Sequence, residues 1–322
     1  RILERKGIAP ADMPDYSIAG CQEPLIMGKE SANTTNSWLN LAKVLELTLN
    51  DGCSLLSGAK LARNTQELGY ASHEALLADL ETAFFRQLEW ILKQMEQAAN
   101  GCTEAIALQA VPFTSALMEG LKSGYDMRDA HHPGVTYHAS GCLIHGLSVV
   151  TDSLVAVRHG LAERAGFAQE LLEALRKNFS GAESFRAYLQ GLPKYGNDDS
   201  EPDELAVQLA HRVSDLVHAL RNPAGSPFLP DFSTPSTHLL YGYHVGATPD
   251  GRPAREMLGY GIDPRRESAH SGRIDQLLSE RKINFGDFLG GYASHLGISP
   301  EVFRNGRDIP EKMKIFTEKI IK

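Results

Sequence analysis

The amino-acid sequence predicts an α/β protein in which helices alternate with short strands. Several stretches carry apolar residues three and four positions apart, which is the repeat of a buried helix face. Residues 105–111 and 238–245 are short apolar or partly alternating runs that are typical of strands. With 322 residues, 42% of them hydrophobic, the chain is long enough to enclose an extended core.

The N-terminal half holds two predicted helices. The first should end at residues 50–52 and has its apolar face at Trp38, Leu41, Leu45 and Leu49. Ser72 is a suitable N-cap for the second, which should end near residue 101. Its stripe, for which we expect ordinary core packing, comprises Leu77, Leu80, Phe84, Leu88, Ile91 and Met95. Strands are expected at residues 105–111 and 135–138.

The C-terminal half holds three more predicted helices. Asp152 opens one, and the others are expected at residues 167–178 and 209–220. Loops rich in proline and glycine at residues 222–235 lead to the strand predicted at 238–245. The polar residues 265–273 should form an exposed loop. Residues 312–322 indicate a helix still under way, so we expect a chain that is cut at its ends.

A cysteine and a carboxylate lie two positions apart in the loop Gly20-Cys21-Gln22-Glu23-Pro24, and no helix or strand repeat explains this spacing. A cysteine sulfur can carry a hydrogen atom, and a nearby carboxylate can accept a proton from a substrate hydroxyl. The alternative is that Cys21 is an inert buried residue, as free cysteines often are. Loops bounded by glycine and proline are common places for reactive groups, which favours the chemical interpretation.

Charge and cysteine content exclude several classes of protein. The net charge of −8 and the pI of about 5.9 argue against nucleic acid or an anionic membrane as the main partner. No apolar run has the length of a membrane span, and the N-terminal residues lack the apolar stretch of a signal peptide, so we expect neither a membrane helix nor a secretory signal. The four cysteines form no C-x-x-C pair, which indicates free thiols in the cytoplasm, and we assign Cys53, Cys102 and Cys142 to the core.

Other polar segments carry weaker signals. The histidines lack metal-ligand spacing, so no metal site is expected. Residues 197–201 lack the spacing of a calcium loop and are expected to be a solvated loop before a helix. Residues 246–252 should form a turn fixed by Pro249 and Gly251, with Arg252 available for a structural ion pair.

Three segments in this order resemble the glycyl radical enzymes of the pyruvate formate-lyase superfamily: the Cys21 loop, Leu-Pro-Lys-Tyr-Gly-Asn-Asp-Asp at 192–199, and Gly-Ala-Thr-Pro-Asp-Gly-Arg at 246–252. The resemblance covers roughly residues 1–260 and is poor over 259–310. It implies a helix-rich part of a ten-stranded α/β barrel, roughly the second half-barrel. Residues 1–322 would form one partial barrel domain, with the cysteine loop near 18–26 and the glycine radical domain absent.

The resemblance also implies roles for particular residues. The loop reads Gly-Cys-x-Glu-Pro, as in the dehydratase and lyase branch of the superfamily. Cys21 would then act as a thiyl radical and Glu23 as the general base, eliminating water, an amine or sulfite from a small hydroxylated substrate. His145 lies in a segment similar to the family's pocket wall. Thr35 and Asn36, candidate substrate contacts, lie where diol dehydratases carry Trp-His-Asp, which argues against glycerol or propanediol.

Pyruvate formate-lyase itself uses two adjacent cysteines, whereas Gln22 follows Cys21 here. Without a second thiol there is no acyl carrier, so elimination is favoured. The alternatives are a formate acetyltransferase-like enzyme, a non-catalytic relic or partner subunit of the same fold, and a helical scaffold. The resemblance implies that this chain binds no cofactor. An S-adenosylmethionine and iron-sulfur activating enzyme would install the glycyl radical on a segment after residue 322, the complete protein would be a homodimer, and this fragment alone would be inactive.

Overall fold

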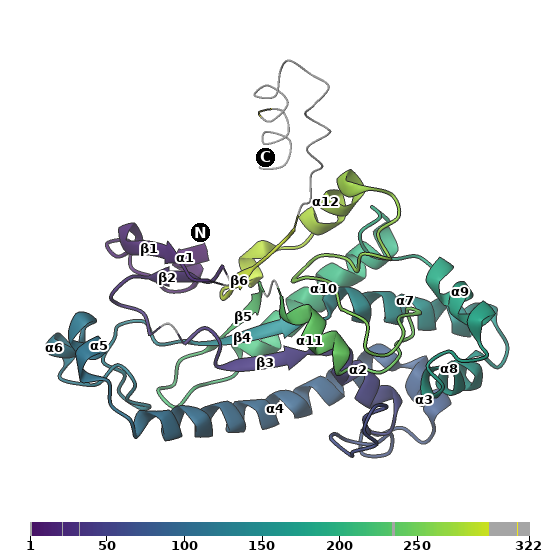
Figure 1. Cartoon of the computed structure of the whole chain (residues 1–322), viewed down its shortest axis with the longest axis horizontal. Helices are drawn as coiled ribbons and strands as arrows, with labels where there is room; N and C mark the ends of the chain where they lie inside the picture. Colours follow the sequence, from purple (N-terminus) through teal and green to yellow (C-terminus); the bar gives the residue numbers. More distant parts are fainter. Residues whose placement is uncertain (1, 21, 32, 234–235, 296–313, 315–322) are drawn as a thin grey trace.

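The computed structural model describes residues 2–20, 22–31, 33–233, 236–295 and 314. Its centre is a four-stranded parallel sheet, and a separate two-stranded hairpin lies beside the N-terminal end of the sheet (Figure 1). The strand order is β3 (Ser37–Asn40), β4 (Ser140–His145), β5 (Phe228–Phe232) and β6 (Gly291–Tyr292). Parallel neighbours need crossover connections, and long helical segments supply them here.

The two faces of this sheet differ because successive side chains on a strand point to opposite sides. One face joins the main hydrophobic core through Leu39, Cys142, Ile144, Phe228 and Phe232. Alternation places the intervening residues on the other face: Trp38, Gly141, Leu143, His145, Leu229 and Asp231. From this second face, Gly141, Leu229 and Asp231 line a cavity together with Glu23 of the hairpin.

Long helices cover the core face of the sheet. They are α2 (Leu41–Leu49), α4 (Leu80–Ala107), α7 (Leu147–Glu163) and α10 (Ser200–His218), and all contribute buried residues to the main core. Side chains of Asn40 and Asp199 cap two of them by accepting the backbone N–H groups of Lys43 and Glu201. The remaining helices are α1 (Ile2–Arg5), α3 (His73–Ala78), α5 (Pro112–Leu117), α6 (Gly120–Ser123), α8 (Phe167–Arg176), α9 (Glu183–Gly191), α11 (Thr237–Tyr243) and α12 (Arg273–Arg281).

The hairpin consists of β1 (Tyr16–Ile18) and β2 (Pro24–Ile26), paired antiparallel with Ile18 opposite Pro24. Short 3-10 turns occur at Met13–Asp15 and Phe285–Asp287. Beyond β2, the chain runs beside Tyr137, which exchanges backbone hydrogen bonds with Lys29 and Ser31. The bridge between Glu30 and Tyr137 is the pairing that residues 135–138 make in place of the predicted strand.

Several predicted helices were placed correctly but with different ends. Trp38 lies in β3 and not on the first helix, because the Asn40 cap starts α2 at Leu41. Ser72 caps only the short α3, and the longer α4 begins after it and continues through Gly101 to Ala107. A glycine inside a helix costs about 1 kcal/mol relative to alanine, which the long buried stripe of α4 outweighs. The helix assigned to start at Asp152 begins earlier, at Leu147.

The predicted strands at residues 105–111 and 238–245 were wrong. The first is the last turn of α4 and the chain after it, where Leu108 is 87% exposed. The second is the helix α11. The true strand β5 lies within the proline-rich segment that was predicted as loop. It was missed because it contains Pro230, and proline is rarely found in a central strand. The helix predicted at 312–322 falls outside the described residues apart from residue 314.

Candidate functional site

The loop that carries Cys21 forms the tip of the β1–β2 hairpin. Ala19 accepts a hydrogen bond from the backbone N–H of Gln22 at 3.0 Å and donates its own N–H to the carbonyl of Glu23 at 2.9 Å. Gln22 has a φ of 75°, a left-handed conformation that costs a non-glycine residue about 1–2 kcal/mol. Cys21 itself lies outside the described residues, so its predicted orientation stays a prediction.

Glu23 is 3% exposed and lines a cavity of about 10 Å³. The walls come from the hairpin, from Asn33 and Thr34, from β4 and β5, and from Gly290. A cavity of this size is close to the minimum that one water molecule needs. A buried carboxyl group beside the Cys21 loop and at a cavity wall is placed as a general base would be. The catalytic role of Glu23 stays a prediction.

Glycines allow these walls to approach one another. A Cβ on Gly141 would lie 1.9 Å from the carbonyl oxygen of Thr34, far inside any real contact. A Cβ on Gly290 would lie 2.8 Å from the Cβ of Asp231, and one on Gly291 would lie 3.1 Å from the carbonyl oxygen of Gln22. The hairpin tip and β5 can therefore meet at the cavity only because β4 and the segment leading into β6 carry no side chains there.

A second carboxyl group, that of Asp231 on β5, lines the same cavity. Asp231 has no solvent exposure, and its Oδ1 accepts the backbone N–H of Ser233 at 2.8 Å. Within the described residues, its Oδ2 has no hydrogen-bond partner. Burial raises the pKa of Asp231 to about 7, and the charge of Glu23 raises it as well. Sequence analysis missed this residue because it read residues 222–235 as loop.

Lys6 and Glu30 complete the charged lining. They form an ion pair in which both side chains are almost fully buried. Lys6 also donates to the carbonyl of Pro24 at 2.5 Å, and Glu30 accepts the backbone N–H of Ile26 at 2.9 Å. The pair therefore fixes the base of the hairpin, and the positive charge of Lys6 is matched by Glu30.

The structure does not bring the other predicted contact residues to this cavity. Thr35 is exposed, and Asn36 donates to the hydroxyl of Thr103 at 3.2 Å. His145 follows Gly141 by four positions on β4, which is about 13 Å along a strand. Its ring lies 4.1 Å from that of Tyr241, and burial lowers its pKa to about 3, so it is neutral. Asn33 and Thr34, not Thr35 and Asn36, line the cavity.

The remaining cysteines do not all lie in the core. Cys142 is fully buried on β4, and burial raises the pKa of its thiol to about 12, so it is an unreactive core residue as predicted. Cys53 is half-buried and Cys102 is exposed on α4, which corrects their assignment to the core. All three are free thiols. The described residues contain no group of three or more His, Cys, Asp and Glu side chains that could hold a metal ion.

Two polar residues near the C-terminal loops also differ from expectation. Arg252 is fully buried and donates to backbone carbonyl oxygens, including those of Gly246 at 2.5 Å and Glu256 at 2.8 Å. The expected ion pair is thus replaced by backbone contacts. Arg265 is 2% exposed and lies 3.5 Å from Asp250, so the predicted exposed loop at 265–273 begins with a buried cation.

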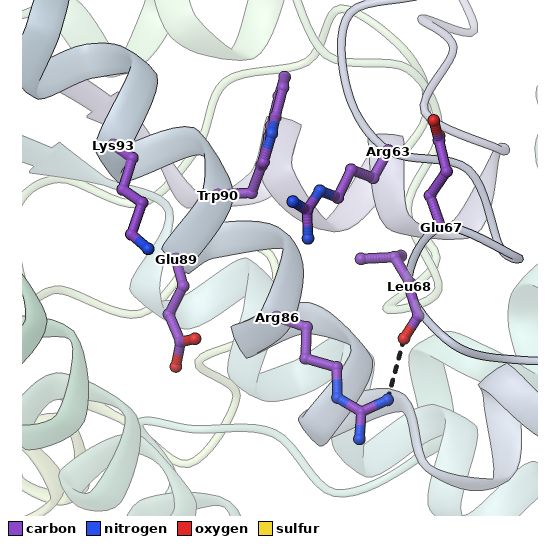
Figure 2. Close-up of a pocket in the computed structure, with 7 residues that line it drawn as sticks. All are labelled: Arg63, Glu67, Leu68, Arg86, Glu89, Trp90 and Lys93. Carbon is purple, nitrogen blue, oxygen red and sulfur yellow. Dashed lines mark hydrogen bonds between the residues drawn. The ribbon is translucent and has the colours of Figure 1, made fainter.

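Other hollows lie away from Glu23. Figure 2 shows the residues that line another cavity, beside α4. Its volume is about 150 Å³, Arg86 donates to the carbonyl of Leu68 at 2.9 Å, and Arg63 lies over the ring of Trp90. Neither the hairpin nor the sheet contributes to it. A hollow of about 520 Å³ adjoins the hairpin tip and is lined by residues that include Gln22, Pro24 and Gly291. Of these three hollows, the two beside the hairpin tip are the better placed for chemistry at the cysteine loop.

The pyruvate formate lyase-like family model matches residues 1–242. The chain is 27% identical over 272 residues to the trans-4-hydroxy-L-proline dehydratase of Clostridioides difficile, a match that covers 83% of this chain and 33% of that protein. It is also 27% identical over 305 residues to the formate acetyltransferase of Haemophilus influenzae, covering 91% of this chain and 36% of that protein. The chain thus spans about a third of the length of these curated relatives.

Among solved structures, the chain resembles the glycerol-bound B12-independent glycerol dehydratase from Clostridium butyricum. The TM-score is 0.88 and the sequence identity 28%, with 99% of this chain and 40% of that chain covered. The prediction that this chain forms part of an α/β barrel of the glycyl radical type is therefore confirmed. Within the described residues, no helix has the length and apolar character needed to cross a membrane.

Proposed function

Because the chain belongs to the pyruvate formate lyase-like family, we propose that the complete protein is a glycyl radical lyase or dehydratase that acts on a small hydroxylated substrate. The observation that carries the proposal is the buried carboxyl group of Glu23, which lines a cavity and lies two positions from Cys21 in the hairpin tip. The similarity to a dehydratase and to a glycerol dehydratase structure supports the same class.

In the proposed reaction, the Cys21 thiyl radical takes a hydrogen atom from the carbon that bears the hydroxyl group. Glu23 then accepts the hydroxyl proton, and the neighbouring carbon loses its leaving group together with the electron pair of that bond. The proton on Glu23 passes to the leaving group. The resulting radical beside the new carbonyl takes a hydrogen atom back from the Cys21 thiol, which restores the thiyl radical and balances the reaction.

The first oxidation of Cys21 requires a radical from outside the described residues. A glycyl radical, installed by an S-adenosylmethionine-dependent activating enzyme, would supply it in the complete protein. We propose this activating enzyme and a second copy of the complete protein as partners, and the cytoplasm as the location. The free thiols of Cys53, Cys102 and Cys142 support a reducing compartment.

A formate acetyltransferase activity is the second candidate, favoured by the similarity to the enzyme of Haemophilus influenzae. Acyl transfer of that kind needs a thiol to carry the acyl group, and the position after Cys21 holds Gln22. We therefore rank elimination above acyl transfer.

The test is an assay of the complete protein after anaerobic activation. One arm supplies pyruvate with coenzyme A, and the other supplies a panel of small diols, amino alcohols and hydroxy acids. We expect carbonyl products from at least one member of the panel, with turnover lost in Cys21→Ala while the glycyl radical signal in electron paramagnetic resonance persists. Formate from pyruvate, or full turnover in Cys21→Ala, would overturn the proposal.

A further inference from the structure

Asp231 is a buried carboxyl group that the proposed elimination does not use. It lies on the non-core face of β5 and lines the same cavity as Glu23. Its Oδ1 is occupied by the N–H of Ser233, whereas Oδ2 has no partner within the described residues. An unpartnered acceptor with no solvent exposure costs free energy unless a ligand supplies a donor.

The charge around this oxygen is negative. The cavity lining contains the carboxyl groups of Glu23, Glu30 and Asp231, and Lys6 is its one cation among the described residues. Lys6 is paired with Glu30 and also bonds the carbonyl of Pro24. The carboxyl groups of the lining thus outnumber its cation, and the Oδ2 of Asp231 has no hydrogen-bond partner among the described residues. A cationic ligand would be attracted to such a site, and an anionic one would be repelled.

The size of the cavity limits the group that can enter. Its volume of about 10 Å³ suits one water-sized group. A primary ammonium group has one heavy atom and three N–H donors, so it fits where a sulfonate, a carboxylate or a trimethylammonium group does not. The rest of a substrate would lie outside this cavity, and the neighbouring residues Gln22 and Gly291 line the larger hollow of about 520 Å³.

We propose that Asp231 binds a primary ammonium group of the substrate, so that the proposed lyase acts on a small amino alcohol and rejects anionic substrates. This inference rests on the proposed function for the chemistry, with Glu23 left to take the hydroxyl proton. Asp231 is a binding residue that determines specificity in this scheme, and it has no role in moving hydrogen atoms.

A consequence concerns pH. The pKa of Asp231 is about 7, and only the ionised form attracts an ammonium group, so affinity for the amine should rise from pH 6 to pH 8. The other charged groups at the cavity are Glu23 on the hairpin and the Lys6–Glu30 pair. Cys142 on β4 stays a neutral thiol in this range because burial raises its pKa to about 12.

The experiment measures binding to the complete protein without activation, so that no turnover occurs. Calorimetry compares three ligands of matched shape: 1-amino-2-propanol, 1,2-propanediol and lactate. We expect the amine to bind tightest and lactate not to bind. Asp231→Asn should weaken amine binding by about tenfold to a hundredfold, the usual range for a hydrogen bond between charged groups, and should remove its pH dependence. Asp263→Asn, at another buried carboxyl group away from this cavity, is the matched control.

The ranking of ligands by the wild-type protein decides the matter even if Asp231→Asn does not fold. Tighter binding of lactate or of the diol than of the amine overturns the inference. Carbonyl formation from the diol but not from the amine after activation also overturns it, while leaving the proposed lyase in place. Asp231-dependent amine binding without any turnover supports the inference and contradicts the proposed function.

Discussion

Glu23 combines near-complete burial with a position at a cavity wall, which is where a general base can meet a substrate but not bulk water. Glu23→Gln keeps the size of the side chain but cannot accept a proton at neutral pH. We expect it to lower kcat for elimination in the activated complete protein by about 10²- to 10⁴-fold, the usual contribution of a general base. Rates of carbonyl formation, measured at equal glycyl radical content, check this.

The control is Glu173→Gln on α8, an exposed carboxylate that pairs with Lys177 and lies outside the hairpin region. It should turn over as the wild type does. Equal losses in the two variants would mean that Glu23 has no special role.

At this scale, the sequence identified one part of the site and missed another. The spacing of Cys21 and Glu23 between glycine and proline drew attention because no periodic element explains it. Asp231 gave no such signal, since its importance depends on the pairing of β5 with β4 and on the approach of Glu23 from a distant segment. Contacts of that kind cannot be read from local spacing.

Among the elements, β4 tolerates the close passage of residues 33–34 because Gly141 has no side chain. Gly141→Ala would place a Cβ against the backbone of Thr34, which must then move. We expect a loss of about 1–3 kcal/mol in the free energy of unfolding, as in other overpacked sites. Gly101→Ala, at an open position six residues before the end of α4, is the matched comparison and should stabilise the chain by about 0.5–1 kcal/mol. Urea unfolding of both variants tests the difference, and a Gly141→Ala variant as stable as Gly101→Ala would contradict it.

The turn at residues 246–252 depends on one buried side chain. Arg252 donates to the carbonyls of Gly246, Pro253 and Glu256, so Arg252→Met would leave several buried oxygens without a donor. Each such group costs about 1–3 kcal/mol, and we expect a total loss of more than 3 kcal/mol in unfolding free energy. Arg255→Met, which removes an exposed guanidinium lying over the Tyr243 ring, should cost less than about 1 kcal/mol. Thermal unfolding ranks the two, and similar losses would show that the buried contacts are unimportant.

Helices could be predicted at this scale more reliably than strands. The apolar repeat located the middle of α2, α4, α8 and α10, because each buries one stripe against the core, but α10 begins at Ser200, nine residues before the predicted start. The strands are short and buried on both faces, so they lack the alternation that reveals a half-exposed strand. Pro230 further disguised β5, and the partial alternation at 238–245 belongs to helix α11.

For the whole molecule, buried acids link stability to pH. Burial raises the pKa of Asp152 from an ordinary value of 3.8 to about 7. Between pH 4 and pH 7, Asp152 therefore carries a proton in the folded chain but not in the unfolded chain. The free energy of unfolding contributed by Asp152 therefore falls as pH rises from about 4 to 7 and is constant above that. Asp231, Asp263 and Glu280 behave in the same way.

Asp152→Asn isolates this effect from the histidines, which titrate equally in both proteins. The variant keeps the acceptor for the N–H of Tyr195 and removes the titrating group. Relative to the variant, the wild type should lose a few kcal/mol between pH 4 and pH 7, at about 1.4 kcal/mol per pKa unit. Urea unfolding at several pH values measures it. A flat difference for Asp152→Asn would refute the argument.

Among the residues that the structure describes, the hairpin that bears Cys21 and Glu23 shares no strand pairing with the four-stranded sheet. Its tip can thus vary in sequence while the pairing of β3, β4, β5 and β6 stays unchanged. Natural selection could exchange one reactive loop for another on a constant scaffold, and related enzymes could diverge in chemistry without first losing stability. A library randomised at residues 19–23 of the complete protein would consequently explore new reactions with few misfolded members.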